Sequence, residues 1–311
     1  MNIPKSITIC EVGLRDGLQN EKTMLQTADK IELAKMIIDS GIKVIELGSF
    51  VSPKAVPVMA DTAEIFRTLG EIPGVELRAF TPNKRGVETA ISCGCKKAKL
   101  NVSASRAHNI ANLNKTPEES VAGFKEAVDL ALENGITVSG SISMPFGSPW
   151  EHAIPLDDVR RIIDAYLAVG VDEISLSDAS GMAVPGQVNM IAATVQKEYP
   201  NVSWWLHAHN TRGTAIANII AAMDAGFTHF DASFAGLGGC PFVPNAAGNV
   251  ATEDVVHMFT EMGVDTGIDL DKVIATAKRA RELVGHDSDS YILRAGASKD
   301  LNLPLPEKKV K

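Results

Sequence analysis

Gly170–Ser175, with the sequence GVDEIS, shows the local pattern that decides the fold of this chain. A helical segment ends in a glycine, and a short run that favours β-structure follows it. The same pattern begins at Gly41, Gly135 and Gly226. Glycine directly after a helix accepts the left-handed conformation that ends the helix, and the β-branched and aromatic residues beyond it favour a buried strand. The chain therefore alternates helices with buried strands.

Eight runs of this kind can be counted, and helical patterns separate them. The segment 27–40 places its apolar residues on one face, and residues 116–119 match a capping box with proline at the first helical position. Eight strand–helix units predict an α/β fold in which a parallel sheet closes into a (β/α)8 TIM barrel. The predicted strands lie near residues 7–13, 43–50, 75–81, 97–103, 136–144, 173–178, 203–209 and 229–235, and further helices near 155–169, 185–198, 213–225 and 251–262.

A doubly wound open sheet is the alternative arrangement. It more often carries a glycine-rich phosphate loop after the first strand, whereas residues 13–21 of this chain are polar and charged. We therefore expect a single TIM-barrel domain over residues 5–285, with an extra helix near 269–284. The polar, proline-broken tail at 286–311 is expected to be a loosely ordered terminus beyond this C-terminal helical extension.

The composition narrows the class of protein. Hydrophobic residues make up 45% of the chain and charged residues 22%, as in a soluble globular protein with a large core. The formal net charge of -8 argues against a nucleic-acid-binding protein, and no apolar run reaches the roughly 18 residues of a membrane span. Few cysteines and the lack of a signal-like start favour a reducing compartment. We expect a cytoplasmic protein that binds neither nucleic acid nor membrane.

Two histidines, His207 and His209, end the predicted strand at 203–209. Side chains alternate between the two faces of a strand, so these two point the same way and can bind one metal ion. An isolated pair of this kind is more often two satisfied polar residues at a strand end. Polar residues at the ends of other predicted strands favour the metal site here, because a barrel of this type keeps its active site at the carboxyl ends of its strands.

Reading only those strand ends gives a short set of candidate residues. Asp16, His207, His209 and Asn249 would together form a mixed nitrogen and oxygen ligand set, in which the oxygens favour Mg or Mn while imidazole admits Zn, Fe or Co. Alone, Asp16 would more often lie on the surface and Asn249 would more often cap a helix. The full set is Arg15 and Asp16 after the first strand, Glu46, Ser49 and Phe50 at the second, Asp178 at the sixth, His207 and His209 at the seventh, and Cys240 and Asn249 after the eighth.

Three of these residues suggest chemistry beyond metal binding. Arg15 offers a fixed fork of donors beside an acidic residue, although a salt bridge across the barrel mouth is the alternative. Glu46 stands in an apolar strand, where burial without a partner would be costly, and pairing with Arg15 would relieve that cost. Cys240 follows two glycines in a loop able to approach a ligand, although a single cysteine is more often inert and buried.

These stretches resemble the 3-hydroxy-3-methylglutaryl-CoA lyase family, a group of metal-dependent TIM-barrel acyl-CoA lyases related to isopropylmalate synthase. The resemblance covers about residues 5–285 in matching order, and its first and last stretches are specific to the lyase branch. The matching stretches are 12–22 (VGLRDGLQNEK), 45–46 (IE), 49–54 (SFVSPK), 207–209 (HAH), 235–242 (AGLGGCPF) and 248–254 (GNVATED).

The resemblance implies a role for each candidate. Arg15 would stabilise the enolate that forms at the thioester carbonyl, and Cys240 would take part in proton transfer. Glu46 and Asp178 would support them. The metal ligands would be Asp16, His207, His209 and Asn249, with His207 also a candidate base, and the substrate contacts would be Gln19, Ser49, Phe50 and Arg212.

The family also implies the reaction. We expect a retro-Claisen cleavage of 3-hydroxy-3-methylglutaryl-CoA to acetyl-CoA and acetoacetate, with Mg or Mn as the cofactor and a small-molecule acyl-CoA as the partner. A homo-oligomer, either a dimer or a tetramer, is expected. The alternatives are a lyase for a related 3-hydroxyacyl-CoA, such as citramalyl-CoA or a longer branched glutaryl-CoA, a condensing enzyme like isopropylmalate synthase, and a barrel that only binds a ligand.

Several positions depart from the family pattern. Leu14 stands where proline is usual, residues 210–213 (NTRG) replace Asp-Thr-Tyr-Gly, and residues 143–150 lack the cysteines often found there. Gly48 and residues 178–181 also differ. The metal set and the cysteine loop are intact, so these departures affect the substrate more than the chemistry. Arg212 could meet an extra carboxylate or could lie on the barrel rim.

Overall fold

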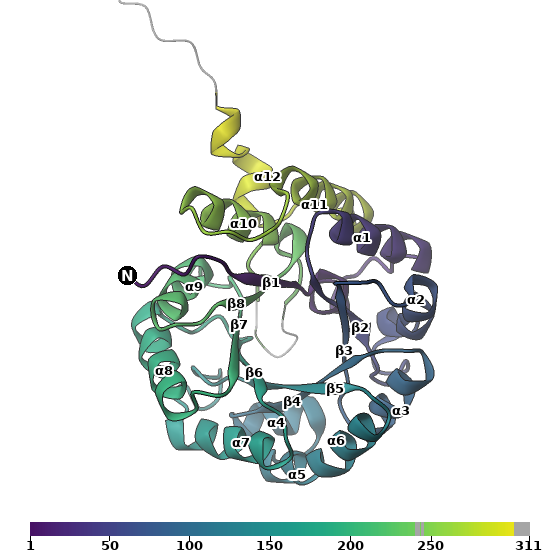
Figure 1. Ribbon diagram of the computed structural model, residues 1–311, viewed down its shortest axis with the longest axis vertical. Helices are drawn as coiled ribbons and strands as arrows, with labels where there is room; N and C mark the ends of the chain where they lie inside the picture. Colours follow the sequence, from purple (N-terminus) through teal and green to yellow (C-terminus); the bar gives the residue numbers. More distant parts are fainter. Residues whose placement is uncertain (240–242, 244–245, 302–311) are drawn as a thin grey trace, which may run out of the picture.

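Eight parallel strands close into a barrel in this computed structural model, which describes residues 1–239, 243 and 246–301. Each strand pairs with the next in the sequence, and β8 pairs with β1 to complete the ring (Figure 1). This confirms the predicted (β/α)8 fold. The strands are β1 (Thr8–Glu11), β2 (Val44–Ser49), β3 (Glu76–Phe80), β4 (Lys97–Ser103), β5 (Thr137–Ser143), β6 (Glu173–Asp178), β7 (Ser203–Ala208) and β8 (His229–Ala232).

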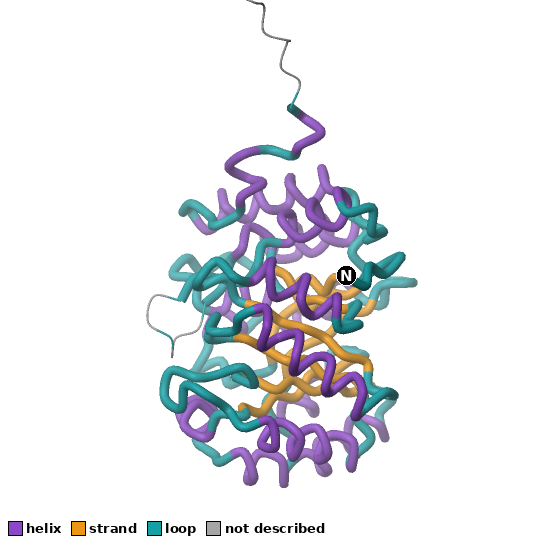
Figure 2. The backbone as a smooth tube through the Cα atoms, turned by 90° about the vertical axis from the view of Figure 1, so that its left-hand side faces the viewer, coloured by secondary structure: helices purple, strands orange, loops and turns teal. Residues whose placement is uncertain are grey.

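Helices surround the strands on the outside of the barrel, as the purple and orange segments of Figure 2 show. Neighbouring helices pack on one another around the ring, for example α8 on α9 and α1 on α11. The helices are α1 (Thr27–Asp39), α2 (Thr62–Leu69), α3 (Lys84–Ser92), α4 (Arg106–Leu113), α5 (Pro117–Ala122), α6 (Phe124–Glu133), α7 (Leu156–Ala168), α8 (Pro185–Glu198), α9 (Ala215–Asp224), α10 (Thr252–Glu261), α11 (Leu270–Val284) and α12 (Tyr291–Ala295).

The local signals in the sequence produce the expected turns. Gly41, Gly135, Gly170 and Gly226 all have positive φ, between 71° and 106°, which only glycine adopts without strain. The capping box also forms before α5, because Thr116 Oγ1 accepts the backbone N–H of Glu119 and the Glu119 carboxylate accepts that of Thr116. Helix ends fixed in this way set where each strand begins, and so set which residues reach the barrel mouth.

The inside of the barrel is polar, whereas the outer face of the sheet is apolar. Along β4, Ala98, Leu100 and Val102 belong to the hydrophobic core beneath the helices. The alternate residue Lys99 instead reaches Glu46 of β2 and Asp231 of β8 across the barrel. Since successive side chains point to opposite faces of a strand, the barrel interior holds charged side chains that must neutralise one another.

A separate group of buried charges fills the end of the barrel where the strands begin. Arg78 pairs with Glu76 and, at 3.1 Å, with Glu173. Lys97 pairs with the same two carboxylates, and the Arg78 guanidinium lies 4.8 Å from the centre of the Trp205 ring. Because the active site of a TIM barrel lies at the opposite end, where the strands finish, we assign this group to the scaffold.

The C-terminal extension packs on the barrel through α10. The carboxylate of Asp254 accepts hydrogen bonds from Ser290 Oγ and from the backbone N–H groups of Tyr291 and Ile292, each at 2.9 Å. The tail that the sequence predicts to be loosely ordered therefore contains a docked helix, α12, because one buried carboxylate satisfies its first turn. Within the described residues, no helix is both long and apolar enough to cross a membrane.

Candidate active site

A cavity of about 350 Å³ opens at the carboxyl ends of the strands. This is the end at which the sequence predicts the site. Its walls include the predicted residues Arg15, Asp16, Gln19, His207 and His209. Residues 143, 177 and 239 also line it, so the cavity is bounded by β5, β6 and the loop after β8 as well.

Asp16 is positioned by a tight turn directly after β1. The carbonyl oxygen of Val12 accepts the backbone N–H groups of Arg15, Asp16 and Gly17, which winds Gly13–Gly17 into one π-helical turn. A side chain at position 13 would collide with the ring of Phe234, so this turn requires glycine there. The turn directs Asp16 toward the barrel axis.

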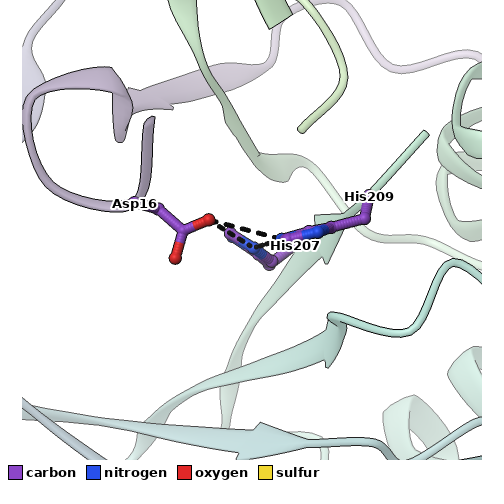
Figure 3. Close-up of side chains that lie close together, drawn as sticks. All are labelled: Asp16, His207 and His209. Carbon is purple, nitrogen blue, oxygen red and sulfur yellow. Dashed lines mark hydrogen bonds and ion pairs between the residues drawn. The ribbon is translucent and has the colours of Figure 1, made fainter. Parts of the chain in front are cut away.

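Asp16, His207 and His209 converge on one point (Figure 3). Asp16 Oδ2 lies 3.3 Å from His209 Nε2 and 3.8 Å from His207 Nε2, and the two imidazole Nε2 atoms are 3.1 Å apart. Burial would raise the pKa of Asp16, but Arg15 and the two histidines hold it well below its usual range. The carboxylate therefore stays ionised, as a metal ligand must.

Asn249 joins this group from the loop after β8. Its backbone forms a bridge with His209, and its side-chain Nδ2 donates to Asp16 Oδ2 at 2.8 Å and to the Leu237 carbonyl at 3.1 Å. Its Oδ1 is buried and has no hydrogen-bond partner among the described residues. Such an atom is costly to bury without a partner. Two imidazoles, one carboxylate and one amide with an unused acceptor fit a divalent ion.

A chain of buried charges connects the histidines to Arg15. His207 Nδ1 contacts Asp231 Oδ2 at 3.2 Å, and Lys99 Nζ contacts the same oxygen at 3.1 Å. Lys99 Nζ also lies 3.2 Å from Glu46. Glu46 in turn pairs with Arg15 Nε at 2.9 Å. The predicted pairing of Glu46 with Arg15 is thus present, within a network that also fixes His207.

Lys99 and Asp231 are the members of this network that the sequence reasoning missed. Burial would lower the pKa of Lys99, but Asp231 and Glu46 raise it. Burial would likewise raise the pKa of Asp231, but Lys99 and His207 lower it. Both groups are therefore charged. The available signal was the alternation of polar residues along 97–103 and 229–233, which indicates a polar barrel interior.

Arg15 is held at the cavity wall by three contacts. Its guanidinium pairs with Asp16 and Glu46 and lies 4.3 Å from the centre of the Phe80 ring. Its side chain is 14% exposed, so the charge is largely withdrawn from water but still borders the cavity. A cation fixed in this way can stabilise negative charge that develops on a substrate oxygen.

The predicted substrate residues lie in three different places. Gln19 lines the cavity, whereas Ser49 and Phe50 line a second cavity beside it, which shares Val51 and Ser52 with the first. Arg212 does not line either cavity among the described residues. Its Nη1 donates to the backbone carbonyls at positions 180 and 181, so it supports the loop that follows β6.

Asp178 also holds the loop that follows β6. Its carboxylate accepts Ser180 Oγ at 2.9 Å and the backbone N–H groups of Met182 and Ala183 at 3.1 Å. Burial raises its pKa, although these hydrogen bonds oppose the rise. Asp178 therefore shapes the wall of the cavity through the loop backbone, while its own carboxylate does not line it.

Cys240 lies outside the described residues. The residue before it, Gly239, lines the cavity, and the carbonyl of Gly239 accepts a hydrogen bond from Asn20 Nδ2 at 2.8 Å. A side chain at Gly238 would collide with the Asn249 amide. The glycines ahead of the cysteine therefore let the backbone pass close to the predicted ligands.

Comparison of the sequence with those of known proteins identifies relatives of this chain. A family model described as HMGL-like matches residues 6–279. A hydroxymethylglutaryl-CoA lyase of Bacillus subtilis is 39% identical over 285 residues, which cover 92% of this chain and 95% of that protein. An (R)-citramalyl-CoA lyase of Chloroflexus aurantiacus is also 39% identical, over 94% of this chain and 95% of its own length.

Structural comparison agrees with these sequence matches. The structure of an HMG-CoA lyase from Acinetobacter baumannii, in complex with coenzyme A and 3-methylmalate, matches this fold with a TM-score of 0.92 at 39% sequence identity. The match covers 97% of this chain and 98% of that one. The family resemblance predicted from the motifs is confirmed by the family model and by these relatives: the chain belongs to the HMGL-like family.

Proposed function

We propose that this protein is a divalent-metal-dependent carbon–carbon lyase that cleaves 3-hydroxy-3-methylglutaryl-CoA to acetyl-CoA and acetoacetate. The observation that carries the proposal is the convergence of Asp16, His207 and His209 at a cavity that Arg15 also borders. Relatives named hydroxymethylglutaryl-CoA lyase match nearly the full chain, which supports the same reaction class here.

The metal would be held by Asp16, His207, His209 and Asn249, with Mg or Mn as the ion. A divalent ion supplies Lewis acidity, which lowers the pKa of a hydroxyl group bound to it. Asp231 contacts His207 Nδ1 at 3.2 Å, and a carboxylate in this position fixes the imidazole so that the lone pair of Nε2 faces the site. That lone pair can serve as a ligand or as a base, but not as both at the same time.

Cleavage begins with loss of the proton from the 3-hydroxyl group of the substrate. The low pKa of Asp16 makes its carboxylate a weak base, so we assign the proton to His207 Nε2. While that proton is bound, the ion would be held by Asp16, His209 and Asn249. The C2–C3 bond then breaks: its electron pair passes into the thioester, forming the acetyl-CoA enolate, and C3 becomes the ketone of acetoacetate. Arg15 provides the fixed positive charge beside the developing enolate oxygen.

Protonation of the enolate carbon completes the reaction and gives acetyl-CoA. We assign this proton to Cys240, because the glycines ahead of it belong to the loop that borders the cavity. Glu46 and Asp178 act as positioning residues, the first by holding Arg15 and the second by shaping the loop after β6. Gln19, Ser49 and Phe50 border the entry that an acyl-CoA would occupy.

The decisive experiment follows the products by mass spectrometry. The purified protein is incubated with Mg or Mn and a panel of 3-hydroxyacyl-CoA thioesters, including 3-hydroxy-3-methylglutaryl-CoA and citramalyl-CoA. Acetyl-CoA and acetoacetate, formed from the first thioester faster than products from any other, support the proposal. Absence of cleavage in metal-loaded protein contradicts it.

Citramalyl-CoA is the second candidate substrate. The (R)-citramalyl-CoA lyase of Chloroflexus aurantiacus is as similar to this chain as the Bacillus subtilis relative is, at 39% identity. Faster cleavage of citramalyl-CoA in the same panel would keep the mechanism and change the substrate.

A homo-oligomeric state and a cytoplasmic location remain predictions, which sedimentation analysis and fractionation test separately.

A further inference from the structure

A lysine stands in the buried face of α1, on the outside of the barrel. Lys30 shares that face with Leu33, Ala34 and Ile37, and its side chain is only 3% exposed. It lines neither cavity, so the proposed reaction does not use it. Lysine is almost never fully buried unless it is paired, because withdrawing an ammonium group from water costs free energy. The partners of Lys30 therefore indicate its role.

These partners lie at the start of α2, the neighbouring helix (Figure 1). Lys30 Nζ donates to both carboxylate oxygens of Asp61, at 2.7 and 2.9 Å, and to the Val58 carbonyl at 2.5 Å. Asp61 is the N-cap residue of α2, yet its side chain caps no backbone N–H of that helix. Aspartate is among the best N-cap residues. Its carboxylate is used here for the contact with Lys30 instead.

The contact lies at the end of the segment that separates the two cavities. We call residues 50–60 the partition segment. Two of its residues, Val51 and Ser52, line both cavities. Others line one cavity each: residues 55 and 56 border the first, and residues 50, 53, 59 and 60 border the second. The position of this segment therefore sets the shape of both cavities.

The partition segment is attached at both of its ends. At its start, the Phe50 N–H donates to the Phe80 carbonyl of β3 at 2.9 Å. At its far end, Thr62 Oγ1 donates to the Met59 carbonyl at 2.8 Å, which joins the segment to α2. Lys30 joins this far end to α1, because it contacts both the segment and α2. Removal of the ammonium group would release the far end from α1 and leave the start in the sheet.

We propose that Lys30 is a positioning residue for substrate binding. Its ion pair with Asp61 holds the partition segment, which borders the entry that an acyl-CoA would occupy. The proposal rests on the proposed function for the identity of that substrate. A buried ion pair stabilises a fold little compared with apolar residues of similar volume, which favours a positioning role. Since Lys30 bonds to Asp61 and Val58 and lines no cavity, it acts on the affinity for substrate and not on the bond that breaks.

Steady-state kinetics separates binding from chemistry. Lys30→Met removes the charge and keeps a long, unbranched side chain. We expect it to raise KM for 3-hydroxy-3-methylglutaryl-CoA about tenfold and to leave kcat within about twofold, because substrate binding is weakened while the reacting groups stay in place. Asp61→Asn should have the same effect. The double variant should raise KM no further, since the two residues act through one contact.

The control is Leu33→Ala, on the same face of α1. Leu33 is fully buried, so its truncation leaves a cavity and lowers stability, but the ion pair stays intact and KM should not change. Unchanged KM in Lys30→Met and Asp61→Asn overturns the proposal, and so does an equal rise of KM in the control or a fall in kcat larger than the rise in KM. If Lys30→Met does not fold, Asp61→Asn carries the test, because its side chain is 18% exposed.

Hydrogen exchange gives a second readout, which is independent of turnover. The backbone N–H groups of Ala55 and Val56 donate to the Ser52 carbonyl, and that of Ala60 donates to the Pro57 carbonyl. These three amides should lose protection in Lys30→Met and in Asp61→Asn while β1–β8 keep theirs. If they do so and wild type cleaves no thioester, the hold of Lys30 on the segment stands and the proposed function fails. Full protection in both variants overturns the positioning role.

Discussion

His209 lies at the centre of the three converging side chains, 3.3 Å from Asp16 and 3.1 Å from His207. We expect His209→Ala to lose bound metal and activity together, with activity falling by at least about 100-fold. Elemental analysis of the purified variant measures the metal per chain. His229→Ala is the control, because His229 packs against Trp205 away from the cavity. A full complement of metal in His209→Ala would refute the ligand assignment.

Cys240 is tested by separating turnover from metal binding. The assigned proton transfer predicts that Cys240→Ala lowers kcat by about 100-fold or more while metal content stays nearly constant. Cys93→Ala serves as the control, because that cysteine is buried at the end of α3. Unchanged turnover in Cys240→Ala would remove the cysteine from the mechanism.

Single residues also show what sequence reasoning can reach. The positions of Gly41 at a helix end and of Asp16 after a strand can be predicted locally, because the few neighbouring residues indicate where a helix or a strand ends. The role of Lys99 depends on its ion pairs with Glu46 and Asp231, which lie on strands across the barrel. The residues near Lys99 in the sequence do not indicate that these two carboxylates lie beside it, so the sequence reasoning missed Lys99.

At the scale of elements, four of the eight strands were predicted from a glycine that ends the preceding helix, and the others from their own strand-favouring runs between helical patterns. The direction of a side chain at a strand end is less predictable. Asp178 was expected to support the catalytic residues and Arg212 to contact the substrate. In the structure, the polar atoms of both bind the loop after β6. The backbone of that loop, rather than the residue type, decides where they point.

Helix α12 gives a prediction about one element. The Asp254 carboxylate, on α10, accepts three hydrogen bonds from Ser290 and from the first turn of α12. Asp254→Ala should therefore destabilise the docking of α12 by about 1–3 kcal/mol. Hydrogen exchange should then lose protection at residues 291 and 292 while β1–β8 keep theirs. Asp271→Ala, which removes an exposed pair with Lys299, should have almost no effect. Equal loss of protection in both variants would contradict this.

At the scale of the whole molecule, two buried carboxyl groups make stability depend on pH. Burial raises the pKa of Glu253 to about 8 and that of Glu11 to about 7, against hydrogen bonds that lower them. In the unfolded chain both groups ionise near their ordinary value of 4.5. Between about pH 5 and 8 the folded protein therefore holds protons that the unfolded chain has lost, and stability falls as pH rises.

The slope of this dependence is measurable. Each group contributes up to about 1.4 kcal/mol per pH unit. Burial lowers the pKa of His108 to about 4, which opposes this trend only up to its ordinary value of 6.5, so the thermal unfolding midpoint should decrease from pH 7 to 8. Glu253→Gln should flatten the decrease, whereas Glu261→Gln, an exposed substitution in the same helix, should not. A midpoint that rises from pH 7 to 8 in wild type would contradict the prediction.

The bridge between Asp16 and Asn249 has a consequence for synthesis of the chain. These two residues are 233 positions apart, and β1 finds one of its two neighbours only when β8 has formed. A growing chain on the ribosome therefore exposes an unpaired edge of β1 until almost the entire barrel has emerged. A metal ion held by the proposed ligand set would bind completely only after that closure. It would therefore stabilise the finished barrel and would not direct its assembly.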